Sequence, residues 1–257
     1  MGNLHSLIRD LQRRKARERR GLVVAEGRRL VADALASGAA VRAVLAAGDV
    51  AAGPAAALIA DAAARGIQVE VVARAEFDAL ADTETPSGVL AVVEWAPLAL
   101  AAVRLEPGPA VVLVLDAVQD PGNVGTMVRT AFALGARCTI ALDGSADLRS
   151  HKVLRSAMGA IFRHRVVQAR AEECLTFLEA EGVVLWAATM DGAPIVPGAQ
   201  VPQRLALAVG NEGGGIRPEL LTRAALRAAV AMRPGAESLN AAVAAGILLH
   251  QVRDAGR

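Results

Sequence analysis

The sequence is poor in aromatic residues and in cysteine. Its 257 residues include no Tyr, two Trp and four Phe, so a platform that stacks single-stranded bases on aromatic rings is not expected. The two cysteines, Cys138 and Cys174, form no CxxC pair and stand apart from any His cluster. Neither a disulfide framework nor a zinc site is therefore indicated, and we expect a protein without a metal.

Long apolar runs are missing as well. Hydrophobic residues make up 54% of the chain, yet no stretch approaches the ~20 uninterrupted apolar residues of a membrane-spanning helix. The N-terminal stretch "MGNLHSLIRDLQRRKARERRG" lacks the apolar core and the small-residue cleavage site of a secretory signal. These absences predict a soluble, cytoplasmic protein that makes no membrane contact.

The formal net charge is only +2, but the basic residues are unevenly distributed. Residues 1–30 contain nine Arg or Lys and three Asp or Glu, so the rest of the chain is slightly acidic. Because Lys and Arg neutralise phosphates, this asymmetry indicates a nucleic acid bound by the N-terminal part of the chain. A solvated helix face is the alternative that composition leaves open.

The alternation of apolar segments predicts two α/β domains. A stretch with three prolines and no strand pattern, 97–109, is predicted to be a linker between a domain over 1–96 and a domain over 110–257. The elements predicted for the first domain are helices at 3–20, 26–38, 54–66 and 74–82, and strands at 41–47, 67–72 and 89–95.

The second domain has nearly pure aliphatic strand patterns. Such runs fit strands that are covered on both faces, as in a parallel sheet with crossover helices. The predicted strands are 110–115, 138–142, 182–188, 205–210 and 226–232, and the predicted helices are 124–135, 171–181, 217–225 and 238–253.

Three polar, glycine-containing loops follow predicted strands of this second domain. They are "LDAVQDPGNVGT" at 115–126, "LALAVGNEGGGI" at 205–216 and "MRPGAESLNA" at 232–241. Each one alone is compatible with an ordinary turn or helix cap. The first lacks both GxGxxG and a GK[ST] ending, which counts against a dinucleotide-dependent oxidoreductase on a doubly wound sheet. All three are expected at the carboxyl ends of strands in one sheet, where open α/β proteins bind ligands.

Considered in order, the loops resemble a known set of motifs. "DPGNVGTMVRTA", "GNEGGG" and "ESLNAAVAA" resemble the three signature motifs of the SpoU (TrmH) family of RNA ribose 2'-O-methyltransferases, part of the SPOUT superfamily. "KVLRSAMGAIFR" resembles the segment that lies between the first two motifs. "VVAEGRRLVADAL" and "LADTETPSGVLAVV" resemble the family's N-terminal RNA-binding domain, which is similar to a ribosomal-protein fold. The resemblance covers nearly the whole chain.

The resemblance implies a fold, a cofactor and a set of site residues. The fold would be a parallel-sheet methyltransferase domain with a C-terminal trefoil knot, preceded by a small α/β RNA-binding domain. S-adenosylmethionine would bind in the knot loops, and residues from both subunits of a homodimer would complete the site. The implied cofactor contacts are Gly210, Val230 and Leu239; the implied catalytic residues are Arg129, Asn123, Glu212, Ser238 and Asn240; the candidate RNA contacts are Arg13, Arg14, Arg17, Arg28, Lys152 and Arg155.

The implied reaction is an in-line methyl transfer to a ribose hydroxyl. A hydroxyl is a poor nucleophile, so the site must align it and help to remove its proton. The family resemblance places Arg129 next to this hydroxyl. A guanidinium in its usual state has no acceptor, so we expect Arg129 to anchor the adjacent phosphate and stabilise the developing alkoxide. Glu212 is the alternative base.

The two-domain layout favours ribosomal RNA as the substrate. The same activity on transfer RNA and a non-catalytic RNA-binding assembly factor remain alternatives, although the intact polar positions of the three motifs count against the second.

Overall fold

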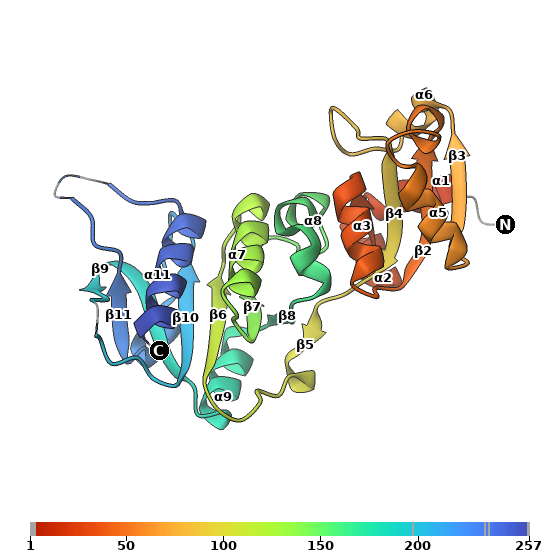
Figure 1. The fold of residues 1–257 in the computed structure, drawn as a ribbon. Helices are drawn as coiled ribbons and strands as arrows, with labels where there is room; N and C mark the ends of the chain where they lie inside the picture. The colour runs from red at the N-terminus through yellow and green to blue at the C-terminus, as the bar shows by residue number, and fades with distance from the viewer. Residues whose placement is uncertain (1–3, 197, 234, 236, 256–257) are drawn as a thin grey trace. The chain divides into compact units, whose positions relative to one another are not determined.

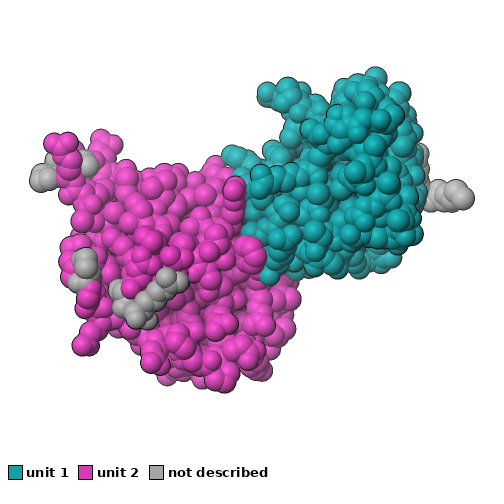
Figure 2. Space-filling model, in the orientation of Figure 1, with its two compact units in different colours: residues 1–96, 147–163 teal, residues 97–146, 164–257 magenta. Residues whose placement is uncertain are grey.

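The structure is a computed structural model that describes residues 4–196, 198–233, 235 and 237–255. It divides into two compact units, teal and magenta in Figure 2. Unit 1 comprises residues 1–96 and 147–163, and unit 2 comprises residues 97–146 and 164–257. Residues 147–163 therefore belong to the N-terminal unit, whereas the sequence pattern placed them in the second domain.

A mixed four-stranded sheet forms the centre of unit 1 (Figure 1). The strands, in sheet order, are β1 (Leu22–Glu26), β4 (Val89–Glu94), β2 (Val41–Ala47) and β3 (Gln68–Val72), and the N-terminal helices are α1 (Leu4–Leu11), α2 (Arg14–Arg20), α3 (Arg28–Ala36), α4 (Gly48–Ala51), α5 (Ala56–Ala64) and α6 (Arg74–Asp78). β4 pairs antiparallel with β1 and β2, and β2 pairs parallel with β3. Alternate strand residues face opposite sides, so α3 and α5 pack on one face and α1 and α6 on the other.

The basic stretch that was predicted as one helix over 3–20 forms two helices, α1 and α2. The guanidinium of Arg17 donates hydrogen bonds to the carbonyls of Leu11 at 2.8 Å and Gln12 at 2.7 Å. A continuous helix would need these carbonyls for its own hydrogen bonds. The buried arginine thereby compensates for the interruption of the helix.

The segment 147–163 completes unit 1. It forms α8 (His151–Ala157) and η2 (Met158–Phe162). Leu154 is fully buried in the core that also contains side chains of α3, and Phe162 packs against this core. The apolar residues of this segment therefore stabilise the N-terminal unit.

Unit 2 contains a seven-stranded sheet in which every pairing is parallel, as its aliphatic strand patterns predict. The sheet order is β11 (Leu226–Ala229), β9 (Val184–Pro194), β10 (Arg204–Gly210), β6 (Ala110–Asp116), β7 (Cys138–Leu142), β8 (Val166–Ala169) and β5 (Leu98–Ala99). The stretch 97–109 is part of this unit, contrary to its prediction as a linker. It carries β5 and η1 (Leu100–Ala102), and it buries Val103 and Leu105 in the core because these side chains are apolar.

Helices cover both faces of this sheet. α7 (Pro121–Ala133) and α11 (Ala241–Ala255) lie side by side in Figure 1 and contact each other. The core on the opposite face includes Cys174 and Leu178 of α9 (Ala171–Ala180) and Leu220 of α10 (Pro218–Arg223). Because the strands are parallel, the loops after β6, β10 and β11 emerge at one edge of the sheet. Among the described helices, none is long and apolar enough to cross a membrane.

Candidate active site

The first of the three loops leads directly into α7. Asp120 is its N-cap, and the carboxylate accepts a hydrogen bond from the backbone N–H of Asn123 at 2.8 Å. Pro121 occupies the first helical position, where its missing N–H is not needed. This capping starts the helix at residue 121, three residues before the predicted start at 124. Asn123 therefore lies in a rigid first turn.

Three polar side chains from the three loops meet at this edge. The Asn123 Nδ2 donates a hydrogen bond to Glu212 Oε1 at 2.6 Å. The Asn240 Nδ2 donates to Asn123 Oδ1 at 3.0 Å and to Glu212 Oε1 at 3.4 Å. Glu212 Oε2 has no hydrogen-bond donor in the described part of the chain. The cluster thus holds one carboxylate oxygen and leaves the other able to accept a proton.

The side chain of Asn240 both caps α11 and joins the polar cluster. Its Oδ1 accepts hydrogen bonds from the N–H groups of Ala242 at 2.9 Å and Val243 at 3.3 Å, as an N-cap does. Its amide Nδ2 is then directed to Asn123 and Glu212. Capping of α11 therefore orients the group that joins the network.

The second loop folds tightly back on the end of β10. Asn211 and Gly215 exchange backbone hydrogen bonds of 3.1 and 2.8 Å. A Cβ atom at Gly210 would overlap the carbonyl of Gly215, so only glycine fits there. The side chain of Asn211 accepts from Gly213 N at 2.7 Å and donates to the carbonyl of Ala117 at 2.9 Å. This loop carries Glu212 to the cluster.

A cavity of about 410 Å³ lies beside the glycine-rich loop. Its walls include all three predicted cofactor contacts, Gly210, Val230 and Leu239, together with Ser238. The remaining lining comes from 188–190, 209–216, Met232 and α11; it is largely apolar side chains and glycine backbone, and it includes the polar residues Thr189, Asn211 and Glu212. Small-molecule sites have this size and this mixture of apolar walls with a few polar groups. The residues present fit a cofactor with an adenine ring and polar ends.

Two predicted catalytic residues are not part of the hydrogen-bonded cluster. Ser238 is exposed on the cavity wall. Arg129 is exposed on α7 and makes no hydrogen bond or ion pair with any described residue. It follows Asn123 by six positions, which in an α-helix means about 9 Å along the axis and about 120° around it. Its own chain therefore does not direct Arg129 at the cluster.

Two of the predicted RNA contacts converge in unit 1. Arg28 and Arg155 line a hollow of about 470 Å³ at the start of α3, together with Arg29. Arg28 donates to the carbonyl of Pro54 at 3.2 Å, and Arg155 forms an exposed ion pair with Asp82 at 2.9 Å. Exposed pairs of this kind contribute little, so these arginines can exchange their partners for phosphates.

The other predicted RNA contacts differ in exposure. Arg13, which precedes α2, is exposed and pairs with Asp10 of α1, and Arg14 is exposed and pairs with Glu18 on the same helix. Lys152 is exposed on α8. The prediction for Arg17 is wrong, because its residue is 6% exposed and its guanidinium is bound inside unit 1. Arg17 is a structural residue.

Sequence reasoning also missed residues that hold the loops. Asp116 is 1% exposed and pairs with Arg217 at 2.6 Å. Asn211 joins the glycine-rich loop to Ala117. A signal for Asp116 is present, since it is the charged end of the aliphatic run "AVVLVLD".

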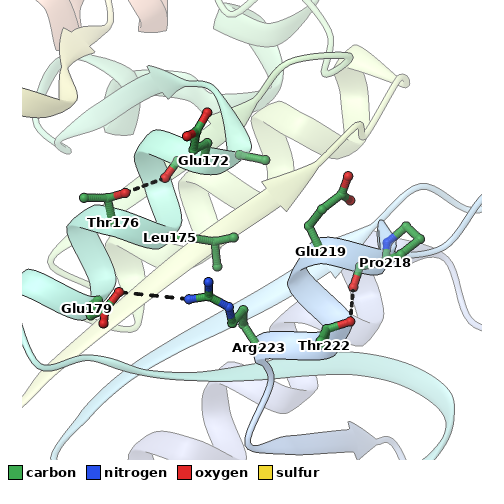
Figure 3. Close-up of a pocket in the computed structure, with 9 residues that line it drawn as sticks. Glu172, Leu175, Thr176, Glu179, Pro218, Glu219, Thr222 and Arg223 are labelled. Atoms are coloured by element: carbon green, nitrogen blue, oxygen red, sulfur yellow. Dashed lines mark hydrogen bonds and ion pairs between the residues drawn. The ribbon is translucent and has the colours of Figure 1, made fainter.

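A larger hollow of about 800 Å³ lies between α9 and α10, and Figure 3 shows it. The hydroxyls of Thr176 and Thr222 donate to carbonyls of their own helices, and Glu179 forms a 4.0 Å ion pair with Arg223. Its lining contains none of the predicted site residues: Ala171, Glu172, Leu175, Thr176, Glu179, Pro218, Glu219, Thr222 and Arg223. This hollow is therefore separate from the three loops.

The two thiols are structural. Burial raises the pKa of Cys138 and of Cys174 to about 12, so both stay protonated and unreactive. No group of three or more His, Cys, Asp or Glu side chains within the described ranges could hold a metal ion.

Comparison with known proteins matches both parts of the chain. Residues 110–250 match the model of the SpoU rRNA Methylase family. Residues 7–91 match that of the MRM3-like substrate binding domain. A relative from Bacillus subtilis, the 23S rRNA (guanosine(2553)-2'-O)-methyltransferase RlmP, is 38% identical over 95% of this chain and 94% of its own length.

Two solved structures are similar over nearly their full length. An AdoMet-bound rRNA methyltransferase from Sinorhizobium meliloti has a TM-score of 0.84 and 29% identity, and the match covers 98% of this chain and 94% of that one. The SpoU methyltransferase AviRb from Streptomyces viridochromogenes, in complex with AdoMet, has a TM-score of 0.84 and 26% identity, with 98% and 97% covered.

Proposed function

The chain belongs to the SpoU rRNA methylase family, and we propose that it transfers the methyl group of S-adenosylmethionine to a ribose 2'-hydroxyl in 23S rRNA. One observation carries this proposal. Asn123, Glu212 and Asn240 come from three separate loops and interlock beside a cavity of cofactor size. The similar 23S rRNA enzyme and the two AdoMet-bound structures support the substrate class and the cofactor.

The cavity residues would hold the cofactor, which supplies an electrophilic methyl group on a positively charged sulfur. Val230 and Leu239 provide apolar walls, and the absence of a side chain at Gly210 lets the backbone of 215–216 pass close to the end of β10. Ser238 adds a hydroxyl to the same wall. These residues bind and orient; the proton is handled by the neighbouring cluster.

Glu212 is the group that can take the ribose proton. Asn123 and Asn240 both donate to its Oε1, which fixes the carboxylate. The free Oε2 can then accept the hydroxyl hydrogen without a change of rotamer. A site that is organised before the substrate arrives needs little reorganisation during the reaction.

A homodimer with a shared site and a knotted C-terminal segment are further parts of the proposal. Phe132 on α7 is 40% exposed and Val243 on α11 is 51% exposed, and apolar side chains of this size favour burial between two copies. Arg129 projects from the same exposed part of α7. In a dimer, Arg129 of the partner subunit can bind the phosphate beside the target ribose and stabilise the developing alkoxide. The knot is supported by the match of residues 110–250 to the SpoU rRNA Methylase family.

Labelled S-adenosylmethionine and unmodified 23S rRNA test the activity. We expect one labelled nucleotide whose 3' linkage resists alkaline cleavage, because a 2'-O-methyl group blocks that reaction. Arg129→Ala should remove most of the turnover while cofactor binding persists in calorimetry. Label on a base, or no label, would refute the proposed reaction.

A mixing experiment tests the shared site. Arg129→Ala and Glu212→Gln chains should each lose most of the activity and retain only a low, measurable rate. A mixture refolded together should regain a large part of the activity, because one site of each mixed dimer contains an intact Arg129 and an intact Glu212. No recovery in a mixture shown by light scattering to be dimeric would contradict the shared site.

Unit 1 would hold the RNA through phosphate contacts and shape, the usual mode for folded RNA. This role is supported by the hollow that is lined by Arg28, Arg29 and Arg155. A cytoplasmic location belongs to the same proposal, since ribosomal RNA is the substrate.

A further inference from the structure

An ion pair between a buried carboxylate and a partly exposed guanidinium lies at the exit of the glycine-rich loop. Asp116 ends β6 and is 1% exposed. Its Oδ1 accepts a hydrogen bond from Arg217 Nε at 2.6 Å, and its Oδ2 accepts one from the backbone N–H of Arg217 at 2.7 Å. Arg217 Nη2 also donates to the carbonyl of Asp143, which follows β7, at 2.9 Å. One residue of the loop exit is thus tied to the ends of two strands.

The entrance of the loop is also held by a hydrogen bond; we call the contacts that hold the two ends of the loop its ties. Asn211 donates to the carbonyl of Ala117 at 2.9 Å. Ala117 has a φ of 53°, a left-handed conformation that is unfavourable for a residue with a Cβ. Its carbonyl is therefore held in an orientation that the chain would not adopt by itself. Both ends of the loop are bound to Asp116 and Ala117, two consecutive residues.

Between these ties the loop is intrinsically soft. Three successive glycines follow Glu212, and glycine has the largest backbone freedom to lose on ordering. The same β6–α7 connection that receives both ties also carries Asn123, which binds Glu212 at 2.6 Å. The ties therefore determine where Glu212 lies relative to Asn123.

We propose that Arg217 and Asp116 are positioning residues for methyl transfer: their ion pair holds the glycine-rich loop so that Glu212 meets Asn123 and Asn240. This inference rests on the proposed function. Arg217 makes no hydrogen bond with the cluster and is not among the residues that line the cofactor cavity, so it acts through Glu212. Misplacement of a catalytic group by about 1 Å can cost about 10²-fold in rate.

Kinetics of Arg217→Met test the role. We expect kcat to fall by about 10²-fold and KM for S-adenosylmethionine to change by less than about threefold. The coupling with Glu212 is the decisive readout. In a Glu212→Gln background, Arg217→Met should lower the remaining rate by less than about threefold, because both changes remove one function. If the fall in kcat of the double variant equals the product of the falls in Arg217→Met and Glu212→Gln, the proposal is overturned.

Two further variants separate positioning from stability. Asp116→Asn combined with Arg217→Met removes both charges, so no unpaired charge stays buried and the protein should fold; its kcat should fall as in the single variant. Arg204→Met breaks a comparable pair with Glu181, 2.8 Å apart at the opposite end of β10, and should leave kcat unchanged. Normal kcat in the folded double variant would contradict the inference.

Amide hydrogen exchange gives a readout that does not need activity. The N–H groups of 213–216 should exchange at least about tenfold faster in Arg217→Met than in the unaltered protein or in Arg204→Met. If the unaltered protein methylates no RNA but this exchange result holds, the proposed function fails and the loop tie stands. Unchanged exchange would refute the tie itself.

Discussion

Replacing Arg17 should destabilise unit 1 without removing a phosphate contact. The guanidinium and the Asp147 carboxylate are 2.7 Å apart, and their side chains are only 7% and 11% exposed. Arg17→Met would leave the Asp147 charge buried without its partner and would free the carbonyls of Leu11 and Gln12. Breaking a buried pair from one side costs about 3–5 kcal/mol, so we expect the free energy of unfolding of unit 1 to fall by that amount.

Fluorescence can isolate unit 1 for this measurement. The chain has two tryptophans, of which Trp95 packs on the core of unit 1 and Trp186 lies in unit 2. In a Trp186→Phe background, urea unfolding followed by fluorescence reports Trp95 alone. RNA affinity is then measured under conditions in which the variant is fully folded, and it should be unchanged.

Matched variants make the result specific. Arg14→Met breaks an exposed pair with Glu18 on one helix, which is worth about 0.3–0.5 kcal/mol. Arg17→Met combined with Asp147→Leu removes both charges and should regain most of the lost stability. A loss below about 1 kcal/mol in Arg17→Met, or weaker RNA binding by the folded variant, would refute the structural role.

Three further predictions concern the cavity, the pH response and the RNA surface. Gly210→Ala adds a Cβ that overlaps the loop backbone. Calorimetry should therefore show a cofactor affinity at least about fivefold lower, as overpacking by about 1 kcal/mol or more implies. Gly246→Ala, with only ordinary contacts, is the control, and unchanged affinity in Gly210→Ala would contradict the assignment of the cavity. Burial lowers the pKa of His164 from 6.5 to about 4, so the unfolded state takes up the proton first, and stability should fall by about 2 kcal/mol between pH 7.5 and pH 5. Urea unfolding of His164→Gln at the two pH values should show a loss of stability that is smaller by this amount. An equal loss in His164→Gln and in the unaltered protein would refute the argument. Replacing Arg28 and Arg29 by Ala should weaken RNA binding and reduce the slope of log affinity against log salt by about 1 to 2, and a constant slope would exclude phosphate contacts.

Regular elements could be predicted where the apolar pattern is long. The segments 41–47 and 138–142 are strands over the predicted residues, because buried parallel or central strands leave a continuous aliphatic run. β1, β5 and β8 were not predicted. β5 and β8 have only two and four residues, and β1 is stabilised by pairing with β4, which is distant in the sequence. The linker prediction for 97–109 failed for a different reason: its three prolines suggested a loop, whereas Val103 and Leu105 are buried in the core.

The polar residues of the cluster could be proposed from the sequence, but their partners could not. Asn123, Glu212 and Asn240 lie in three loops that follow strands of one parallel sheet, so their meeting follows from topology. Arg17 looks like any other residue of a basic run, and its partner Asp147 is 130 positions away. A local pattern carries no information about a pairing of that range.

The position of 147–163 in the chain has a consequence for how the two units depend on each other. The chain leaves unit 2 after β7 and returns to it at β8, and between them it contributes Leu154 to the core of unit 1 and Asp147 to the buried pair with Arg17. The core of unit 1 therefore needs residues 147–163, which lie in the sequence between the two segments of unit 2. A cut at the end of residue 96 would leave a buried leucine and a buried carboxylate without their partners. The chain thus passes between the two units three times, after residues 96, 146 and 163, and removal of unit 1 would leave the apolar segment 147–163 without the core in which it is buried.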